Sequence, residues 1–185
     1  MRVEDCFFET PRLRAVGWHT PSSVPDHGSR LPQVVRDFLT PRVTAQLPET
    51  WQGPYSEQRA IEWIRDRDAE GTQLLATSRS SDEPIGLVLL YETTGASPPA
   101  PEFRLGYLIT ESEWGKGYAS ELVCGLVDWA RDRSFVSITA GVLAENLPSV
   151  RVLEKCGFSR GDDEDSSGTE LFYGIDLSSG TSIQP

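Results

Sequence analysis

Two glycines flank a lysine immediately before a segment whose pattern predicts a helix. The stretch reads EWGKGYASELV over residues 113–123, and apolar residues then recur at helical spacing to about residue 133. Glycine is unfavourable in a helix because its backbone loses more freedom on folding than that of other residues. Gly115 and Gly117 therefore indicate a backbone turn that serves something other than helix stability, with the helix beginning close to it.

A strand is predicted just before this turn, over residues 102–110 (EFRLGYLIT). A strand, a glycine turn and a helix N-terminus in succession suit an anion, since the first N–H groups of a helix lack partners and its dipole is positive there. The chain contains neither GxxxxGK[ST] nor GxGxxG at this turn. The sequence thus favours a pyrophosphate site outside those two folds, with a plain tight turn as the alternative.

A second helix start is encoded by ENLPSVRVLEKCGF, residues 145–158. Asn146 suits a helix N-cap, Pro148 is tolerated in the first turn, and Gly157 suits the C-terminal stop. The start and the stop of the helix do not require a serine at position 149, which lies near the positive end of the helix. Ser149 is therefore a candidate functional residue.

The rest of the chain predicts further strands and helices around these two segments. The expected strands cover residues 7–16, 72–78, 84–92, 136–143 and 170–177, and the expected helices cover 31–39 and 56–70. This order indicates an α+β (mixed α/β) fold with a single sheet and helices on its faces. The length of 185 residues, 38% of them hydrophobic, fits one domain over residues 1–177 and a flexible tail over 178–185.

The net charge of −11 argues against a nucleic-acid or anionic-membrane partner, because a phosphate surface would repel the chain. The charge is compatible with a cationic substrate, and alternatively it only keeps the protein soluble. There is no run of about 18 apolar residues that could cross a bilayer, and charges interrupt the first twenty residues where a signal peptide needs an apolar core. We therefore expect a cytoplasmic protein.

Cysteine and histidine patterns predict neither a disulfide framework nor a metal site. Cys6, Cys124 and Cys156 are odd in number and widely spaced, so we expect all three to be reduced. His19 and His27 lie alone in a polar stretch, without the clustered ligands that zinc requires.

Together, GYLITESEWGKGYASELV and, about 28 residues later, NLPSVRVLEKCGF resemble the GNAT acetyltransferase superfamily, in particular its RimJ/RimL-like branch of protein N-terminal amine acetyltransferases. The opening FETPRLRAV is similar to the first strand of that branch. The resemblance covers most of the chain and is weakest over residues 17–55 and after 159. It implies a mostly antiparallel sheet in which two splayed parallel neighbours hold acetyl-CoA between them.

The resemblance also implies which residues meet this cofactor. The family's pyrophosphate loop, Q/R-x-x-G-x-G/A, falls on Trp114, Gly115, Lys116, Gly117, Tyr118 and Ala119. Trp114 departs from the family pattern, but such a loop binds through backbone N–H groups. The strand residues implied at the pantetheine amides are Tyr107, Leu108 and Ile109. Asn146 matches the family's cofactor-contacting asparagine, and Ser149 matches the hydroxyl near the CoA sulfur.

The general base is not fixed by this resemblance. Many members of the family have a glutamate two residues before the glycine that matches Gly106, where this chain has Arg104. Glu102 lies two residues earlier on the same strand face, so it is a candidate catalytic base, with a solvated charge as the alternative. Arg104 is expected either to bind an acidic group of the substrate or to pair with Glu102.

Two further segments bear on the acceptor. The acidic run DDEDSSGTE, residues 162–170, is expected to be a solvated loop or a collar that attracts a cationic amine. The aromatic residues that are expected in the core or in an acceptor pocket are Trp18, Trp51, Tyr55 and Trp63.

The sequence thus predicts an acetyl-CoA-dependent N-acetyltransferase that moves an acetyl group to a primary amine by direct attack. The acceptor is a protein N-terminus or a small-molecule amine. Transfer of a larger acyl group and a non-catalytic acyl-CoA-binding module remain alternatives, and a homodimer is plausible for the family.

Overall fold

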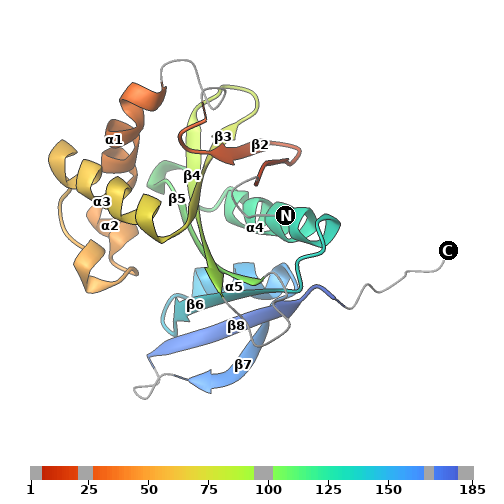
Figure 1. Ribbon diagram of the computed structural model, residues 1–185. Helices are drawn as coiled ribbons and strands as arrows, with labels where there is room; N and C mark the ends of the chain where they lie inside the picture. The colour runs from red at the N-terminus through yellow and green to blue at the C-terminus, as the bar shows by residue number, and fades with distance from the viewer. Residues whose placement is uncertain (1–5, 21–26, 94–101, 165–168, 179–185) are drawn as a thin grey trace.

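The centre of the fold is one sheet, in the order β1-β2-β3-β4-β5-β6-β8-β7 (Figure 1). The computed structural model describes residues 6–20, 27–93, 102–164 and 169–178. The strands are β1 (Phe8–Glu9), β2 (Leu13–Gly17), β3 (Thr72–Ser78), β4 (Pro84–Thr93), β5 (Glu102–Ile109), β6 (Ser137–Leu143), β7 (Ser159–Glu164) and β8 (Glu170–Asp176). Neighbouring strands run antiparallel except β5 and β6, which run parallel.

Helices cover both faces of this sheet. The helices α1 (His27–Phe38), α2 (Pro41–Thr44) and α3 (Glu57–Glu70) pack on one side, and α4 (Tyr118–Asp132) and α5 (Leu147–Lys155) lie on the other (Figure 1). Two short 3-10 turns, η3 (Glu49–Trp51) and η4 (Glu111–Glu113), precede α3 and α4. The expected α+β architecture, a mixed sheet between helices, is confirmed.

Side-chain alternation along the strands divides the core into two clusters. On β5, Phe103 and Leu105 point into a cluster with Leu122 and Leu126 of α4, whereas Leu108 packs on the opposite side with the helices α1 and α3. A strand that is buried on both faces reads as nearly continuous apolar sequence, as β4 does from Ile85 to Leu90. The sheet therefore forms the middle layer between two layers of helices.

Local caps explain several boundaries that the sequence predicts. The Ser56 hydroxyl accepts a hydrogen bond from the Arg59 N–H at 3.2 Å, and α3 ends at Gly71, as expected. The opening strand is instead interrupted, because Thr10 forms a turn: its N–H donates to the Leu13 carbonyl at 2.9 Å and its hydroxyl accepts from the Leu13 N–H at 3.0 Å. The expected single strand over 7–16 is therefore two short strands.

The acidic run is the clearest departure from the expected fold. Its first three residues belong to β7, which pairs with β8, so residues 162–164 are not a loop. Strand propensity is low in SRGDDE, but the exposed edge of β8 offers a ladder of backbone partners that local preference cannot anticipate. Residues 165–168 of the run, and all of the expected tail except Ser178, lie outside the described residues.

Candidate active site

A cleft opens where β5 and β6 separate. Within the described residues, the two strands pair over three positions, from Glu102 with Ser137 to Arg104 with Thr139. Beyond these positions β5 continues to Ile109 beside β4, and β6 continues to Leu143 beside β8. The resulting cleft has a volume of about 590 Å³ and is lined on its floor by residues 104–108 and 140–143. Among the described residues, the backbone groups of β5 beyond Arg104 that face this gap have no partner on β6, so they could bind a ligand.

The glycine turn follows directly on β5. Gly115 and Gly117 have φ angles of 76° and 83°, a left-handed conformation that glycine adopts without a Cβ clash. A Cβ built on Gly115 would meet no atom within 4 Å, so conformation rather than crowding requires a glycine there. Gly117 is the N-cap of α4, and no side chain caps the helix. The N–H groups of its first turn therefore stay open for an anion.

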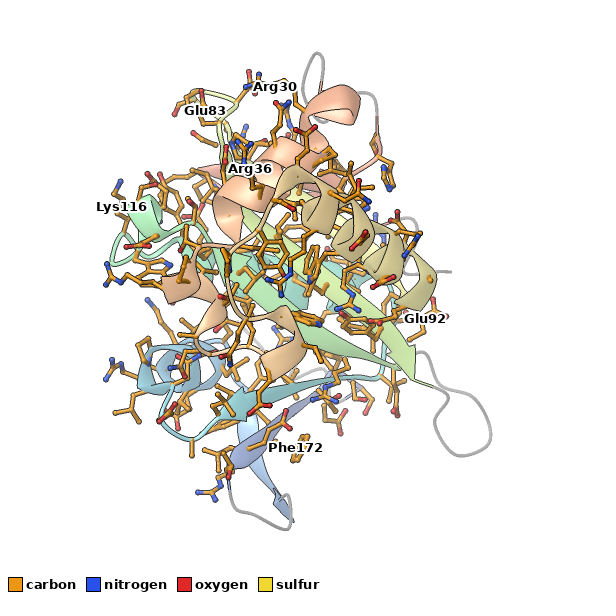
Figure 2. The ribbon with its side chains drawn as sticks, turned by 90° about the vertical axis from the view of Figure 1, so that its left-hand side faces the viewer. Arg30, Arg36, Glu83, Glu92, Lys116 and Phe172 are labelled. Carbon is orange, nitrogen blue, oxygen red and sulfur yellow. A yellow bond between two sulfur atoms is a disulfide. The ribbon has the colours of Figure 1, made fainter. Side chains whose placement is uncertain are left out.

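Trp114 fixes this turn to the end of β5. Its indole N–H donates to the Ile109 carbonyl at 2.8 Å, and the Arg42 guanidinium lies 5.4 Å from its ring centroid. Lys116 instead forms an ion pair with Glu113, with 2.9 Å between Nζ and Oε1, and its side chain lies at the outer edge of the molecule (Figure 2). The tryptophan at the first loop position is thus a structural anchor, and the lysine charge is partly neutralised.

Arg12 also supports the turn, although sequence reasoning did not single it out. From the β1–β2 connection, its Nε donates to Glu121 Oε2 at 2.6 Å and its Nη1 donates to the Lys116 carbonyl at 3.1 Å. The guanidinium also lies 4.2 Å from the centroid of the Tyr118 ring. The sequence carries no local signal for this contact, because Arg12 and Glu121 are 109 residues apart.

The second helix start brings Ser149 into the cleft. Asn146 is the N-cap of α5, and its side-chain carbonyl accepts a hydrogen bond from the Ser149 N–H at 3.3 Å. The Ser149 hydroxyl oxygen lies 2.7 Å from the phenol oxygen of Tyr107 on β5. Asn146, Ser149 and Tyr107 all line the cleft, so three residues that the sequence predicted at the site are brought together.

Arg104 and Glu170 form an ion pair at the closed end of the cleft, where β5 and β6 separate. The Arg104 Nη2 and the Glu170 Oε1 are 3.0 Å apart, and both side chains are partly exposed. The pair crosses over Gly141, where a Cβ would lie 2.1 Å from the glutamate oxygen and 2.5 Å from the arginine nitrogen. Glu102, the sequence-derived base candidate, is not among the described residues that line the cleft.

Beside this pair, part of the sheet is left uncovered by helices. Phe172 lies on β8 below the helices α1–α3, in a part of the sheet that they do not cover (Figure 2). The Arg104 guanidinium lies 5.7 Å from the centroid of its ring. The ion pair and the Phe172 ring therefore lie together on this part of the sheet.

The connection between α2 and α3 forms the wall opposite α5. Trp51 lines the cleft, and its ring stacks on the guanidinium of the buried Arg67 at 4.2 Å. Gln46 also lines the cleft, and its buried Oε1 has no hydrogen-bond partner among the described residues. Trp18 and Trp63 belong to the core, and Tyr55 lies outside the cleft lining. Of the four aromatic residues in question, Trp51 is the one that meets the cleft.

The cysteine prediction was wrong for two of the three residues. Cys124 of α4 and Cys156 at the end of α5 form a disulfide, with 5.0 Å between their Cα atoms. They are 32 residues apart, and only the packing of α4 against α5 brings them together. Cys6 is free and buried, and burial raises the pKa of its thiol far above the ordinary value.

The structure also bears on metals and membranes. Across the ranges that it describes, no group of three or more His, Cys, Asp or Glu side chains is arranged to hold a metal ion. His19 lies 3.0 Å from the Asp68 carboxylate in an exposed pair. No helix in the described part of the chain has the length and apolar character needed to cross a membrane.

The chain matches a known protein family. The family profile described as "Acetyltransferase (GNAT) domain" matches residues 29–159. A probable N-acetyltransferase of Bacillus subtilis, YjcK, is 40% identical over 83 residues, a match that covers 44% of this chain and 44% of that protein.

Two solved structures are similar in fold. The ribosomal-protein α-N-acetyltransferase RimL in complex with coenzyme A has a TM-score of 0.70 at 15% identity, over 94% of this chain and 99% of that one. A spermidine N-acetyltransferase from Vibrio cholerae, in complex with CoA and spermine, has a TM-score of 0.65 at 19% identity, over 90% of this chain and 96% of that one. At these identities the likeness concerns the fold.

Proposed function

Because the chain belongs to the GNAT acetyltransferase family, we propose that it transfers the acetyl group of acetyl-CoA to a primary amine, as an enzyme of the RimJ/RimL-like branch. The observations that carry this proposal are the cleft between β5 and β6 and the uncapped N-terminus of α4, the helix that follows β5 in the chain. An open strand edge suits a chain of amides, and a helix N-terminus with left-handed glycines suits a pyrophosphate.

The residues present fit this donor. We assign the backbone of Tyr107, Leu108 and Ile109 to the pantetheine amides, the loop from Trp114 to Ala119 to the pyrophosphate, and Asn146 to a further cofactor contact. When bound, acetyl-CoA supplies a thioester whose carbonyl carbon accepts the amine nitrogen and whose sulfur leaves with the C–S electron pair. The chain's own residues then have two tasks: to stabilise the leaving sulfur and to accept the amine proton.

Ser149 is the residue that we assign to the leaving sulfur. It lies in the first turn of α5, where the helix dipole favours negative charge. An ordinary thiol has a pKa of about 8.5, so its thiolate needs only a hydrogen bond or a late proton near neutral pH. A hydroxyl in this position is therefore sufficient to stabilise the leaving sulfur, and a strong acid is not required.

Glu170 is better placed than Glu102 to accept the amine proton. Its carboxylate lines the cleft beside Arg104, whereas Glu102 lies at the paired start of β5. An α-amine has a pKa of about 8 and a lysine amine one of about 10.4, so an α-amine needs far less help to lose its proton. We propose that Glu170 removes this proton directly or through a water molecule.

A pair of isosteric variants separates the two carboxylates. Glu170→Gln should lower kcat/KM for an α-amine acceptor by about 100-fold, a normal contribution of a general base. Glu102→Gln should stay within about twofold of the parent protein across the pH profile, as expected of a surface change. If Glu102→Gln lowered kcat/KM and Glu170→Gln did not, the role of general base would belong to Glu102.

The charges of the cleft favour a cationic acceptor. Among the residues that the structure describes, three carboxylates, of Glu49, Glu145 and Glu170, line it against the single guanidinium of Arg104. The whole chain carries a net charge of −11, which adds a long-range attraction for cations. Such attraction is screened by salt, so the KM for the amine should rise as ionic strength rises. A KM that does not respond to salt would argue against a cationic acceptor.

The proposed activity is tested by the release of free CoA thiol from acetyl-CoA with a panel of amines. The panel contains N-terminal peptides, polyamines and aminoglycosides, and Gly117→Glu serves as a control because it puts a negative charge and a strained φ at the anion site. Amine-dependent release that the control abolishes supports the proposal and identifies the acceptor class. Binding of acetyl-CoA without release would favour the acyl-CoA-binding module, and faster release from longer acyl-CoA donors would favour the larger acyl group.

A further inference from the structure

The hydroxyl groups of Tyr107 and Ser149 form a short hydrogen bond across the cleft. Their oxygens are 2.7 Å apart, and they come from different elements, β5 and α5. Tyr107 packs against the main core cluster, so its ring has little freedom to move. The contact therefore joins the open edge of the sheet to the first turn of the helix that carries the serine.

Either hydroxyl could be the donor in this hydrogen bond. The phenol could donate either to the Ser149 hydroxyl at 2.7 Å or to the Ser149 carbonyl at 3.5 Å. The second distance is near the limit at which a hydrogen bond is effective, whereas the first is ideal for two hydroxyls. With the Tyr107 O–H as the donor to the serine oxygen, the serine hydrogen is free to turn toward the cleft.

This donor keeps its proton throughout the useful pH range. Burial raises the pKa of Tyr107 to about 12, and the hydrogen bond with Ser149 offsets only part of this effect. The titratable and charged side chains that share the cleft are Glu49, Tyr91, Arg104, Glu145 and Glu170. None of them donates to or accepts from the Tyr107 hydroxyl in the part of the chain that the structure describes.

We propose that Tyr107 is a positioning residue that holds the Ser149 hydroxyl in the orientation from which it donates a hydrogen bond to the departing sulfur of the acyl donor. The proposal rests on the proposed function, since it requires CoA in the cleft. It assigns Tyr107 a side-chain role in addition to the backbone contact inferred from the strand.

The role is one of hydrogen bonding rather than proton delivery. Transfer of the phenol proton through Ser149 to a thiolate would move it from a group with a pKa of about 12 to one of about 8.5, which is roughly three-thousandfold unfavourable. The C–S electron pair therefore stays on sulfur as the bond breaks, stabilised by the serine O–H. Water or buffer protonates the thiolate afterwards.

The direct test measures the pKa of the CoA thiol while CoA is bound, from the ultraviolet absorbance of the thiolate. A donated hydrogen bond stabilises the thiolate and lowers this pKa. Tyr107→Phe retains the ring but removes the donor, and should raise the bound thiol pKa by about half a unit to one unit. Ser149→Ala should raise it by at least as much.

The combined variant shows whether Tyr107 acts through Ser149. In the Ser149→Ala background, Tyr107→Phe should change the bound thiol pKa by less than about 0.2 units, because the group that it orients is gone. Tyr173→Phe is a matched control: it removes a buried phenol whose hydroxyl donates to Glu154 at 3.3 Å, outside the cleft lining, and should leave the value unchanged.

Kinetics provide the second readout. Tyr107→Phe should lower the single-turnover rate roughly five- to thirtyfold with little change in the Kd for acetyl-CoA, since the loss concerns the departing sulfur and not the bound cofactor. Equal effects of Tyr107→Phe with and without Ser149, or no effect on the bound thiol pKa, would overturn the proposal. Failure of CoA to bind the parent protein at all, measured by calorimetry, would instead overturn the proposed function.

Discussion

The disulfide between Cys124 and Cys156 makes the stability of this protein depend on redox conditions. The bond joins the helix that follows the glycine turn to the end of the helix that carries Ser149. Both helices also contribute buried apolar side chains to the same core cluster, including Leu122, Leu126 and Leu153. Reduction should therefore leave the native packing in place and act mainly on the unfolded chain, which gains freedom.

The expected magnitude follows from the length of the closed loop. For a separation of 32 residues, the chain-entropy relation gives about 12 cal/mol/K, or a free energy of unfolding lowered by about 3.7 kcal/mol at about 25 °C. In a domain of this size each kcal/mol shifts Tm by about 2–4 °C, so reduction should lower Tm by roughly 7–15 °C. This loss is a large share of the about 5–15 kcal/mol by which domains are stable.

Scanning calorimetry with and without a phosphine reductant measures this shift. The variant that carries both Cys124→Ala and Cys156→Ala is the control, because its Tm should not respond to reductant while Cys6 is retained. Alkylation after denaturation should modify Cys6 alone before reduction and all three cysteines after it. Alkylation could detect the bond while its reduction moves Tm by less than about 2 °C. That result would refute the loop-entropy reasoning.

The state of this bond depends on the compartment in which the protein resides. Thiol-reducing systems keep cysteines reduced in the cytosol of most cells, whereas oxidising compartments preserve disulfides. A chain in a reducing cytosol would hold two free thiols at these positions and would have the lower of the two stabilities. The thiol state of the protein in freshly lysed cells, trapped by alkylation, decides which form is present.

Three substitutions test other parts of the fold. Gly125→Ala should destabilise α4 by about 1 kcal/mol in urea unfolding, because its Cβ would lie 2.5 Å from Thr10 Cγ2 and overpacking outweighs the gain in helix propensity; a more stable variant would contradict this. Gly141→Ala should lower kcat/KM for the acceptor about fivefold or more with a small change in Tm, because its Cβ displaces the flexible ends of Arg104 and Glu170; an unchanged kcat/KM would argue against a role of the pair in the reaction. Burial raises the pKa of Glu121, but hydrogen bonds from Thr10 and Arg12 outweigh it, so the folded value lies below the ordinary 4.5. Its stabilisation is complete above that value and is lost as the pH falls, so Glu121→Gln should lower stability near neutral pH and flatten the decline below about pH 5.

The features that the sequence predicted correctly are those with a local physical cause. A left-handed turn requires glycine at positions 115 and 117. The start of α4 follows from this turn, because Gly117 is the N-cap of the helix. Asn146 and Ser56 cap their helices because short polar side chains accept hydrogen bonds from first-turn N–H groups. Such signals lie within a few residues of the structure that they specify.

The features that sequence reasoning missed depend on contacts between distant segments. Cys124 and Cys156 meet because two helices pack together, and β7 forms because the edge of β8 is available. The partner of Arg104 is also remote: the sequence suggested an acidic substrate group or Glu102, and the structure provides Glu170 from β8. No local pattern encodes these pairings, which appear only once the strand order is known.

The short ladder between β5 and β6 has a consequence for the motion of the molecule. Three residue pairs join a five-strand part of the sheet, β1 to β5, to a three-strand part formed by β6, β8 and β7. The amide hydrogens of β5 that face the gap have no acceptor on β6, so they should exchange with solvent far faster than those that face β4. A ligand whose amides hydrogen-bond to this edge would take the place of a strand and slow that exchange. It would also couple the motions of the two parts of the sheet.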